Sequence, residues 1–327
     1  MTVLVTGAAG FIGFHVTQAL LHRGERVIGV DNFNPYYSVA LKRARLKELS
    51  GNTRFSFHRL DLAKPGALAA MAKRQRGLDR VIHLAAQAGV RYSLENPRAY
   101  VAANLVAQLE VLEFCRTLKD LRHLVFASSS SVYGGNTKLP FAEDDRVETP
   151  QSLYAATKRA DELMSYTYAH LYRLPTTGLR FFTVYGPWGR PDMAAWLFTD
   201  AILKGKPIKL FNAGRMRRDF TYIDDIVAGV LAALDHPPAD QGAEPPYRLY
   251  NLGNNHAEEL GRFVALLEAA IGRKAKSIDL PMQPGDVAAT FADIAAAKRD
   301  LGFAPTTPID RGLPRFVDWY RAYHKIR

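Results

Sequence analysis

Short apolar runs alternate with longer amphipathic stretches through the first half of this 327-residue chain. Between residues 11 and 23, Ile12, Val16 and Leu20 share one face of a predicted helix, which is expected to end at Gly24. Strands are predicted at 3–5, 27–30, 55–59, 81–84, 124–127 and 176–182. An alternation of this kind predicts a parallel sheet with helices on both of its faces.

Three glycines follow the first predicted strand. Gly7, Gly10 and Gly13 belong to the segment 4–13, Leu-Val-Thr-Gly-Ala-Ala-Gly-Phe-Ile-Gly, in which a strand turns directly into a helix. At such a turn a diphosphate approaches the amides at the start of the helix. Side chains at Gly7 and Gly10 would block that approach, and one at Gly13 would push the helix off the sheet. The segment therefore predicts a dinucleotide-binding site.

An acidic residue ends the second predicted strand. Asp31 lies 18 residues after Gly13, close to the roughly 20 residues expected for a carboxylate that binds the ribose of a dinucleotide. A carboxylate accepts hydrogen bonds from a ribose 2′-OH and repels a 2′-phosphate. Asp31 therefore predicts NAD rather than NADP as the cofactor.

The pattern changes after Pro187, where connections rich in proline, glycine and arginine separate shorter elements. Residues 250–253 nevertheless have the pattern of one further strand of the first sheet. We therefore predict an α/β fold, a Rossmann-type doubly wound parallel sheet with a smaller C-terminal α/β substrate domain. The NAD-binding domain is expected at 1–186 plus about 219–257, and the substrate-binding domain at 187–218 plus 258–327.

The single cysteine bears on the cellular compartment. Cys115 has no second cysteine to pair with and falls in an apolar helical pattern, so helix packing is expected rather than nucleophilic chemistry. The first strand is predicted two residues after the initial Met, which leaves no room for a signal peptide, and no apolar run approaches a membrane span. These features predict a cytoplasmic protein in a reducing compartment.

The formal net charge of +11 permits three explanations. Nucleic-acid binding is one, but the basic residues are dispersed and lack a recognition motif, so no nucleic-acid partner is expected. Attraction of an anionic small substrate is the second. A basic, solubilising surface without any role in binding is the third.

A phenol and an ammonium lie four residues apart at Tyr154 and Lys158, and hence on one face of a predicted helix. A nearby cation favours the phenolate, which can take a proton from a sugar hydroxyl while a hydride leaves for NAD. An amphipathic helix with an exposed lysine has the same spacing. However, the serines at 128–131 directly follow a predicted strand, where a hydroxyl can contact the same reacting oxygen. Together these segments predict a catalytic set.

The segments 127–134, 154–158 and 179–187 resemble nucleotide-sugar 4-epimerases of the extended short-chain dehydrogenase/reductase superfamily. The segments 31–37, 83–91, 188–193, 217–225 and 283–286 are similar to UDP-glucuronate 4-epimerases in particular, so the resemblance covers nearly the whole chain. It implies a UDP-sugar substrate, NAD as cofactor, no metal ion, and 4-epimerisation of UDP-glucuronate to UDP-galacturonate.

The resemblance also implies roles for individual residues. The catalytic residues are Ser129, Tyr154 and Lys158, although the hydroxyl that contacts the reacting oxygen stays open among Ser129, Ser130 and Ser131. The expected cofactor-binding residues are Gly7, Gly10, Phe11, Ile12, Gly13, Asp31, Asn32, Asp61, Leu62, Leu84, Ala85, Ala86, Gln87, Asn104, Tyr154 and Lys158. The expected substrate-binding residues are Arg91, Ser129, Ser130, Ser131, Thr183, Arg190, Arg218 and Asp286. For Arg190 and Arg218, a solvated loop arginine is the alternative.

Departures from related patterns help to separate the possible activities. Galactose-type epimerases have a lysine where this chain has Ala88 and an arginine where it has Gln283, which argues against a neutral sugar. Dehydratases of the superfamily place acidic residues beside the catalytic hydroxyl, and 128–131 contain none. A UDP-glucuronate decarboxylase, a UDP-glucose 4-epimerase and a catalytically silent NAD-binding scaffold or RNA-binding protein remain as alternatives.

Two predicted helices suggest how copies of the chain associate. The segments 99–116 and 154–172 both have apolar faces, and in extended members of the superfamily the corresponding helices pair across a two-fold axis. A homodimer is therefore expected, with no membrane partner. The alternative is that both faces pack only within the monomer.

Overall fold

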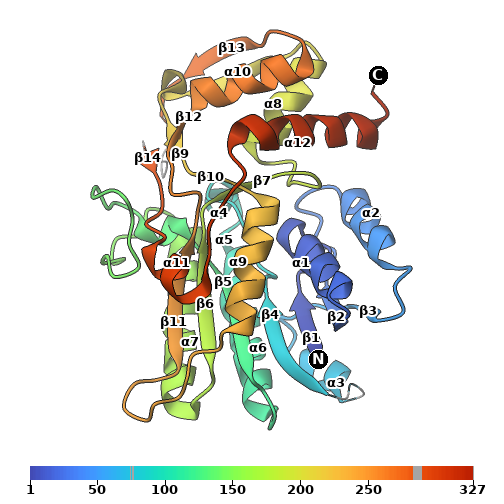
Figure 1. The fold of residues 1–327 in the computed structure, drawn as a ribbon, viewed down its shortest axis with the longest axis vertical. Helices are drawn as coiled ribbons and strands as arrows, with labels where there is room; N and C mark the ends of the chain where they lie inside the picture. Colours follow the sequence, from blue (N-terminus) through green and yellow to red (C-terminus); the bar gives the residue numbers. More distant parts are fainter. Residues whose placement is uncertain (74, 76, 283–288, 327) are drawn as a thin grey trace.

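The computed structural model describes residues 1–327 apart from 74, 76, 283–288 and 327 (Figure 1). Within this part of the chain, seven parallel strands form one sheet in the order β11-β6-β5-β4-β1-β2-β3. The strands are β1 (Thr2–Thr6), β2 (Arg26–Asp31), β3 (Phe55–Arg59), β4 (Leu78–His83), β5 (His123–Ser129), β6 (Thr176–Phe181) and β11 (Tyr247–Leu252). Every predicted strand is present, and the late strand predicted at 250–253 is confirmed as β11 beside β6.

Helices cover both faces of the sheet, as Figure 1 shows. One face carries α1 (Phe11–His22), α2 (Val39–Leu49), α9 (Ile223–Asp235) and α11 (Ala295–Leu301); the other carries α3 (Ala67–Ala72), α6 (Ala107–Thr117) and α7 (Leu153–Tyr172). Successive side chains of β1 point to opposite faces. Val3 and Val5 accordingly pack in the core under α1 and α9, while Leu4 packs in the core under α6. This arrangement confirms the doubly wound fold.

The helical region before β5 differs in detail from the single helix predicted at 99–116. Two short helices, α4 (Tyr92–Glu95) and α5 (Pro97–Tyr100), lead into a π-helical turn, η1 (Val101–Val106), and then into α6. The wider π turn contains Asn104, which is 1% exposed and bonds inward to other segments of the chain. Cys115 in α6 is fully buried and burial raises the pKa of its thiol, so its predicted role in packing is confirmed.

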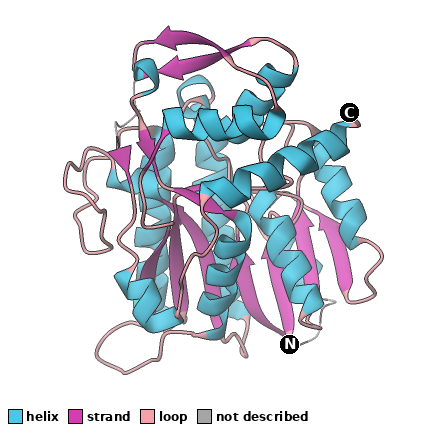
Figure 2. Cartoon of the chain, turned by 45° about the horizontal axis from the view of Figure 1, so that its top comes forward, coloured by secondary structure: helices cyan, strands magenta, loops and turns pink. Residues whose placement is uncertain are grey.

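A smaller group of elements lies beyond the carboxyl ends of the strands (Figures 1 and 2). In it, α10 packs against α8 and α12, and β8 pairs in parallel with β13. The elements are α8 (Ala194–Leu203), β8 (Pro207–Phe211), η3 (Asn212–Gly214), α10 (Leu260–Ile271), β13 (Lys276–Leu280) and α12 (Ile309–His324).

Short strands connect this group to the large sheet. A parallel pair is formed by β7 (Thr183–Tyr185) and β10 (Phe220–Tyr222), and a three-stranded sheet by β12 (Glu258–Glu259), β9 (Arg217–Arg218) and β14 (Ala289–Thr290). The domain boundaries proposed from the sequence stay a proposal. Helix α11 lies in the range proposed for the second domain. It packs against β11 and α9, which lie in the range proposed for the first domain.

None of the helices in the described ranges is long and apolar enough to cross a membrane.

Candidate active site

A cavity of about 1100 Å³ lies where the large sheet meets the smaller group of elements. The segments that follow β1, β2, β4 and β5 line one side of it, and residues of β7, α8 and β8 line the other. The strand order changes direction between β1 and β4, and ligands of open parallel sheets bind at the carboxyl ends of the strands at such a point. The topology therefore places the cavity where a cofactor is expected.

The turn between β1 and α1 has the geometry of an anion-binding site. Gly7 adopts φ +72°, and a Cβ on it would lie 2.9 Å from the backbone nitrogen of Ala85. A Cβ on Gly13 would lie only 2.0 Å from the carbonyl oxygen of Gly7. Both glycines are therefore required by contacts within the protein itself, in addition to any approach by a ligand.

The amides at the start of α1 are available to a diphosphate. Phe11, Ile12 and Gly13 are the first residues of the helix, so their N–H groups have no acceptor within it. All three residues line the cavity. The cradle left by the glycines and the positive end of the helix dipole fit a dinucleotide diphosphate.

The carboxylate of Asp31 lies at the end of β2 and is 8% exposed. It accepts hydrogen bonds from the backbone N–H groups of Phe33, at 2.8 Å, and of Ala9, at 3.3 Å. Ala9 belongs to the glycine turn, so Asp31 also stabilises the loop that faces the diphosphate. Since each carboxylate oxygen can accept two hydrogen bonds, both keep capacity for ribose hydroxyls.

Asn104 holds the loop after β4 against the helix that carries Tyr154. Its side chain accepts a hydrogen bond from the amide of Gln87, at 2.8 Å, and donates to the carbonyl of Gln87 and to the hydroxyl of Thr157. Thr157 in turn donates to the carbonyl of Tyr154. Asn104 is absent from the cavity lining, so it acts on the site through Gln87 and Thr157.

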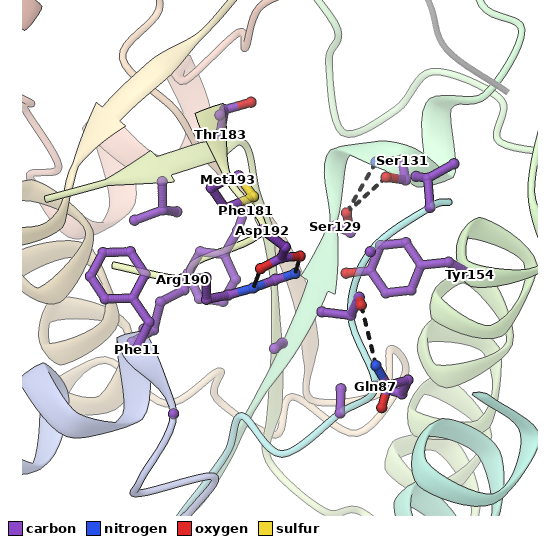
Figure 3. Close-up of a pocket in the computed structure, with 18 of the residues that line it drawn as sticks. Phe11, Gln87, Ser129, Ser131, Tyr154, Phe181, Thr183, Arg190, Asp192 and Met193 are labelled. Atoms are coloured by element: carbon purple, nitrogen blue, oxygen red, sulfur yellow. Dashed lines mark hydrogen bonds and ion pairs between the residues drawn. The ribbon is translucent and has the colours of Figure 1, made fainter. Parts of the chain in front are cut away.

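Tyr154 lies in the first turn of α7, where Ser152 caps the helix by accepting from the amide of Ala155 at 3.1 Å. Ser129 ends β5, and its hydroxyl donates to Ser131 at 3.2 Å. Figure 3 shows the phenol of Tyr154 pointing into the cavity beside Ser129 and Ser131, with Thr183 on the far side. The predicted phenol and serine hydroxyls are thus brought together by separate elements of the fold.

Lys158 also lines the cavity, although it is only 3% exposed. Its Nζ donates to the carbonyl of Ala127, at 3.0 Å, and to the carboxylate of Asp161, at 2.9 Å. Burial works against the ammonium, but Asp161 and then Tyr154 outweigh that effect and hold the pKa of Lys158 above its ordinary value. Lys158 is therefore a cation at neutral pH.

A buried polar network supports the serine segment from behind. The hydroxyl of Ser128 donates to Glu162 at 2.6 Å, and Arg180 donates to both oxygens of the same carboxylate, at 2.8 and 3.0 Å. Arg180 also donates to the hydroxyl of Tyr133, which follows the serines in η2 (Ser130–Tyr133). These bonds anchor β5, β6 and α7 to one another directly beneath Ser129.

Arg190 lines the cavity but is already paired within the protein. Its guanidinium binds Asp192, with Nε 3.0 Å from one carboxylate oxygen (Figure 3). Tyr36 donates to the other oxygen at 3.0 Å. Burial opposes ionisation of Asp192, but Arg190 overcomes this and lowers the pKa of that carboxyl. The positive charge of Arg190 is therefore neutralised where it borders the cavity.

A model of the NAD dependent epimerase/dehydratase family matches residues 3–253. The chain belongs to this family. A probable UDP-glucuronate 4-epimerase of Rhizobium meliloti is 47% identical, over 98% of this chain and 97% of that protein. UDP-glucuronate 4-epimerase 4 of Arabidopsis thaliana is 50% identical, over 99% of this chain and 76% of that protein. The solved structure of a Bacillus cereus UDP-glucuronic acid 4-epimerase in complex with UDP-glucuronic acid and NAD superposes with a TM-score of 0.90, at 35% identity, over 99% of this chain and 100% of that one.

In this member of the family, most residues proposed for the site line one cavity. They are Gly7, Gly10, Phe11, Ile12, Gly13, Asp31, Asn32, Asp61, Leu62, Leu84, Ala85, Ala86, Gln87, Arg91, Ser129, Ser130, Ser131, Tyr154, Lys158, Thr183, Arg190 and Arg218. Arg91 lies over the ring of Phe211, and Arg218 donates to the carbonyl of Arg217. Gln283 and Asp286 lie outside the described residues. The functional roles of all these residues stay proposals.

Sequence reasoning missed several polar residues of the site. Tyr36 and Asp192 both line the cavity, and both lie in segments that resemble the epimerases, so the same comparison contained the signal. Arg45 is fully buried and donates to the carbonyls of Ala9 and Trp188. In the sequence it stands among Lys42, Arg43 and Lys47, and nothing there distinguishes it from a surface arginine.

Replacing Asp31 with Ala should weaken NAD binding by ~1.5–3 kcal/mol, the range for a hydrogen bond to a charged group. Loss of the carboxylate should also reduce the preference for NAD over NADP, because the repulsion of a 2′-phosphate disappears. Titration calorimetry with both cofactors measures the two effects. Asp79→Ala, at the opposite end of the sheet, is the matched control and should leave the preference unchanged. Equal affinity of the unmodified protein for NAD and NADP would contradict the assignment.

Tyr154→Phe keeps the ring and removes the proton acceptor. Since general acid–base groups contribute typically 10²–10⁴-fold, we expect turnover to fall by about that factor while NAD stays bound. Steady-state rates together with cofactor quantification in the purified variant test this. Tyr250→Phe removes the hydroxyl that donates to Asp300 outside the cavity and should retain normal turnover. Near-normal turnover of Tyr154→Phe would remove Tyr154 from the mechanism.

Proposed function

We propose that this protein is an NAD-dependent UDP-glucuronate 4-epimerase, which converts UDP-glucuronate to UDP-galacturonate through a 4-keto intermediate. The observation that carries the proposal is the meeting of Tyr154, Lys158 and Ser129 at one cavity, which the glycine turn borders. Support comes from the similarity, along nearly the whole chain, to proteins named UDP-glucuronate 4-epimerases. A binding scaffold would not require a phenol four residues before a buried lysine.

Different residues of the chain carry out different parts of the reaction. NAD, when bound, would supply a reversible acceptor for the hydride of C4′, and the glycine turn and Asp31 would hold it. Inversion at C4′ requires the 4-keto sugar to rotate about its diphosphate linkage between removal and return of the hydride. Tyr154 takes the proton from the 4′-OH and later gives it back, and the buried ammonium of Lys158 lies one turn along the same helix, also at the cavity. Ser129 donates a hydrogen bond to the reacting oxygen and so holds it beside Tyr154.

The hydroxyls around the cavity and the pairing of Arg190 favour epimerisation over decarboxylation. A 4-keto sugar with a C6′ carboxylate is a β-keto acid, and loss of CO₂ moves negative charge from C6′ toward the C4′ oxygen. Hydroxyls of Thr183, Ser130 and Ser131 hold the carboxylate by hydrogen bonds and keep its charge at C6′, while Ser129 serves the reacting oxygen. A free cation opposite the carbonyl would help the competing reaction, and Asp192 neutralises the nearby Arg190.

We also propose that the protein is a homodimer. The outer faces of α6 and α7 expose Leu109, Leu163, Tyr166 and Leu171, with 41%, 52%, 45% and 60% of their surface accessible. The two helices pack against each other, which brings these exposed apolar side chains onto neighbouring helices. Pairing of this face with its copy across a two-fold axis would bury it as an isologous four-helix contact. The cytoplasmic location stays a prediction from the single reduced cysteine.

The substrate assignment is tested by incubating the purified protein with UDP-glucuronate and with UDP-glucose, followed by chromatography of the sugar nucleotides. UDP-galacturonate should form with little UDP-pentose. UDP-glucose leaves the hydroxyls that hold the carboxylate unpaired, so its conversion should be slower by on the order of 10⁴-fold or more. Equal rates for both substrates, or UDP-pentose as the main product, would overturn the substrate assignment and leave the fold assignment in place.

Thr183→Ala tests the hydroxyl contacts in the same assay. It should slow epimerisation of UDP-glucuronate and raise the share of CO₂ loss, because one donor to the carboxylate is removed. The control Thr117→Ala removes a hydroxyl that donates to a carbonyl at the end of α6, outside the cavity, and should change neither quantity.

The dimer is tested by light scattering at about micromolar concentration. The unmodified protein should be a dimer. The variant Leu163→Glu should be a monomer, because a charge cannot be buried in the apolar contact without a partner. The matched control Ile278→Glu alters a similarly exposed side chain on β13, in the smaller group of elements, and should stay dimeric. A monomeric unmodified protein would rule out the proposed assembly.

A further inference from the structure

The ammonium of Lys158 has three N–H donors, and two of them are taken up by the protein. One reaches the carbonyl of Ala127 and another the carboxylate of Asp161, at 3.0 and 2.9 Å. Because Lys158 borders the cavity, the third N–H is left for a bound ligand or for Tyr154. The two protein contacts therefore fix the orientation of the ammonium group.

Asp161 is the carboxylate that balances the charge of Lys158. Burial raises the pKa of this carboxyl to about 6 and Lys158 works against that rise, so Asp161 is ionised at neutral pH. It is 1% exposed, lies one turn after Lys158 on α7, and forms the only ion pair of Lys158 found within the described residues. The adjacent Glu162 is committed to Arg180, Arg159 and Ser128. A buried cation without an opposite charge nearby is strongly disfavoured, so Lys158 depends on Asp161 to stay protonated.

The other titratable groups near Lys158 do not replace Asp161. His83, at the end of β4, bonds to the hydroxyl of Thr6 at 2.7 Å, and burial followed by the charge of Lys158 lowers its pKa to about 3. His83 is therefore neutral and supplies no negative charge. Tyr154, on α7, carries a phenol and not a carboxylate, so it does not replace Asp161 as the partner of the ammonium.

The second oxygen of Asp161 points to a role beyond packing. Asp161 Oδ1 is buried and has no hydrogen-bond partner among the described residues. Such an unpaired buried acceptor is unfavourable for stability, and native proteins keep few of them. A purely structural residue at this position would gain from being an apolar side chain, whereas a counter-charge for Lys158 must be a carboxylate.

We propose that Asp161 is a positioning residue of the reaction, which keeps Lys158 protonated inside the protein and directs its third N–H toward the cavity. The proposal rests on the proposed function for its catalytic consequence. The charge pairing itself holds whichever sugar the protein acts on. Asp161 thereby sets the upper end of the pH range in which the Tyr154–Lys158 pair works.

The variant Asp161→Asn removes the charge and keeps the shape and an acceptor oxygen for Lys158. Without the carboxylate, burial is no longer offset and the pKa of Lys158 falls. The basic limb of the pH–turnover profile should therefore move to lower pH by ~1 unit or more, the usual effect of an opposite charge at this distance. A structural role alone would lower turnover at every pH and leave the limb in place, which would overturn the proposal.

A measurement without sugar nucleotide separates this proposal from the proposed function. In the unmodified protein the raised pKa of Lys158 contributes stability at neutral pH, which is lost as the pH rises through that pKa. In Asp161→Asn the lysine charge is unfavourable at neutral pH, and this penalty disappears as the pH rises. The difference in melting temperature between the two proteins should therefore narrow as the pH rises from neutral to above about 10.4, the ordinary pKa of a lysine side chain.

Asp225→Asn is the matched control for both measurements. Asp225 is a buried carboxylate of α9 outside the cavity, and it accepts from the amides of Thr306 and Thr307. This variant should lose stability by an amount that does not narrow with pH, and its basic limb should not move. If the melting difference of Asp161→Asn is equally constant, the proposal is wrong. If the melting difference of Asp161→Asn narrows with pH but the unmodified protein does not convert UDP-glucuronate, the charge pairing stands and the proposed function fails.

Discussion

The contact between Gly13 and the carbonyl oxygen of Gly7 sets the position of α1 on the sheet. A Cβ on Gly13 would lie 2.0 Å from that oxygen, so only glycine lets the helix begin this close to β1. Because β1 pairs with β2 on one side and β4 on the other, the turn lies among the central strands. The neighbouring segments are placed relative to it, since Asp31 reaches the amide of Ala9 and Gly7 packs on the backbone of Ala85.

The second half of the site depends on buried hydrogen bonds between elements that are distant in the sequence. Asn104 connects the loop after β4 to the start of α7, and Glu162 connects α7 to β5 and β6. Fully paired buried polar groups make such an arrangement rigid, because breaking one bond leaves its partner unsatisfied in a nonpolar environment. Ser129 and Tyr154 are held between these two bridges.

Two of the cations that border the cavity are each balanced by a carboxylate beside them. Lys158 is paired with Asp161, and Arg190 with Asp192. These two cations therefore act through direction and at short range. Lys42, Arg91, Lys209 and Arg218 also line the cavity, so its described lining, like the whole chain, has more basic than acidic residues.

Much of the architecture follows from local rules that the sequence already contains. Alternating apolar runs determine the strands, the spacing of Gly7, Gly10 and Gly13 determines the first turn, and the four-residue spacing of Tyr154 and Lys158 determines their common helix face. Only the tertiary structure decided the partners of these polar and charged side chains. Arg45 bonds to Trp188, Tyr36 bonds to Asp192, and the π turn directs Asn104 to Gln87. Such contacts join residues that have no periodic relation along the chain, because they depend on where the folded elements meet.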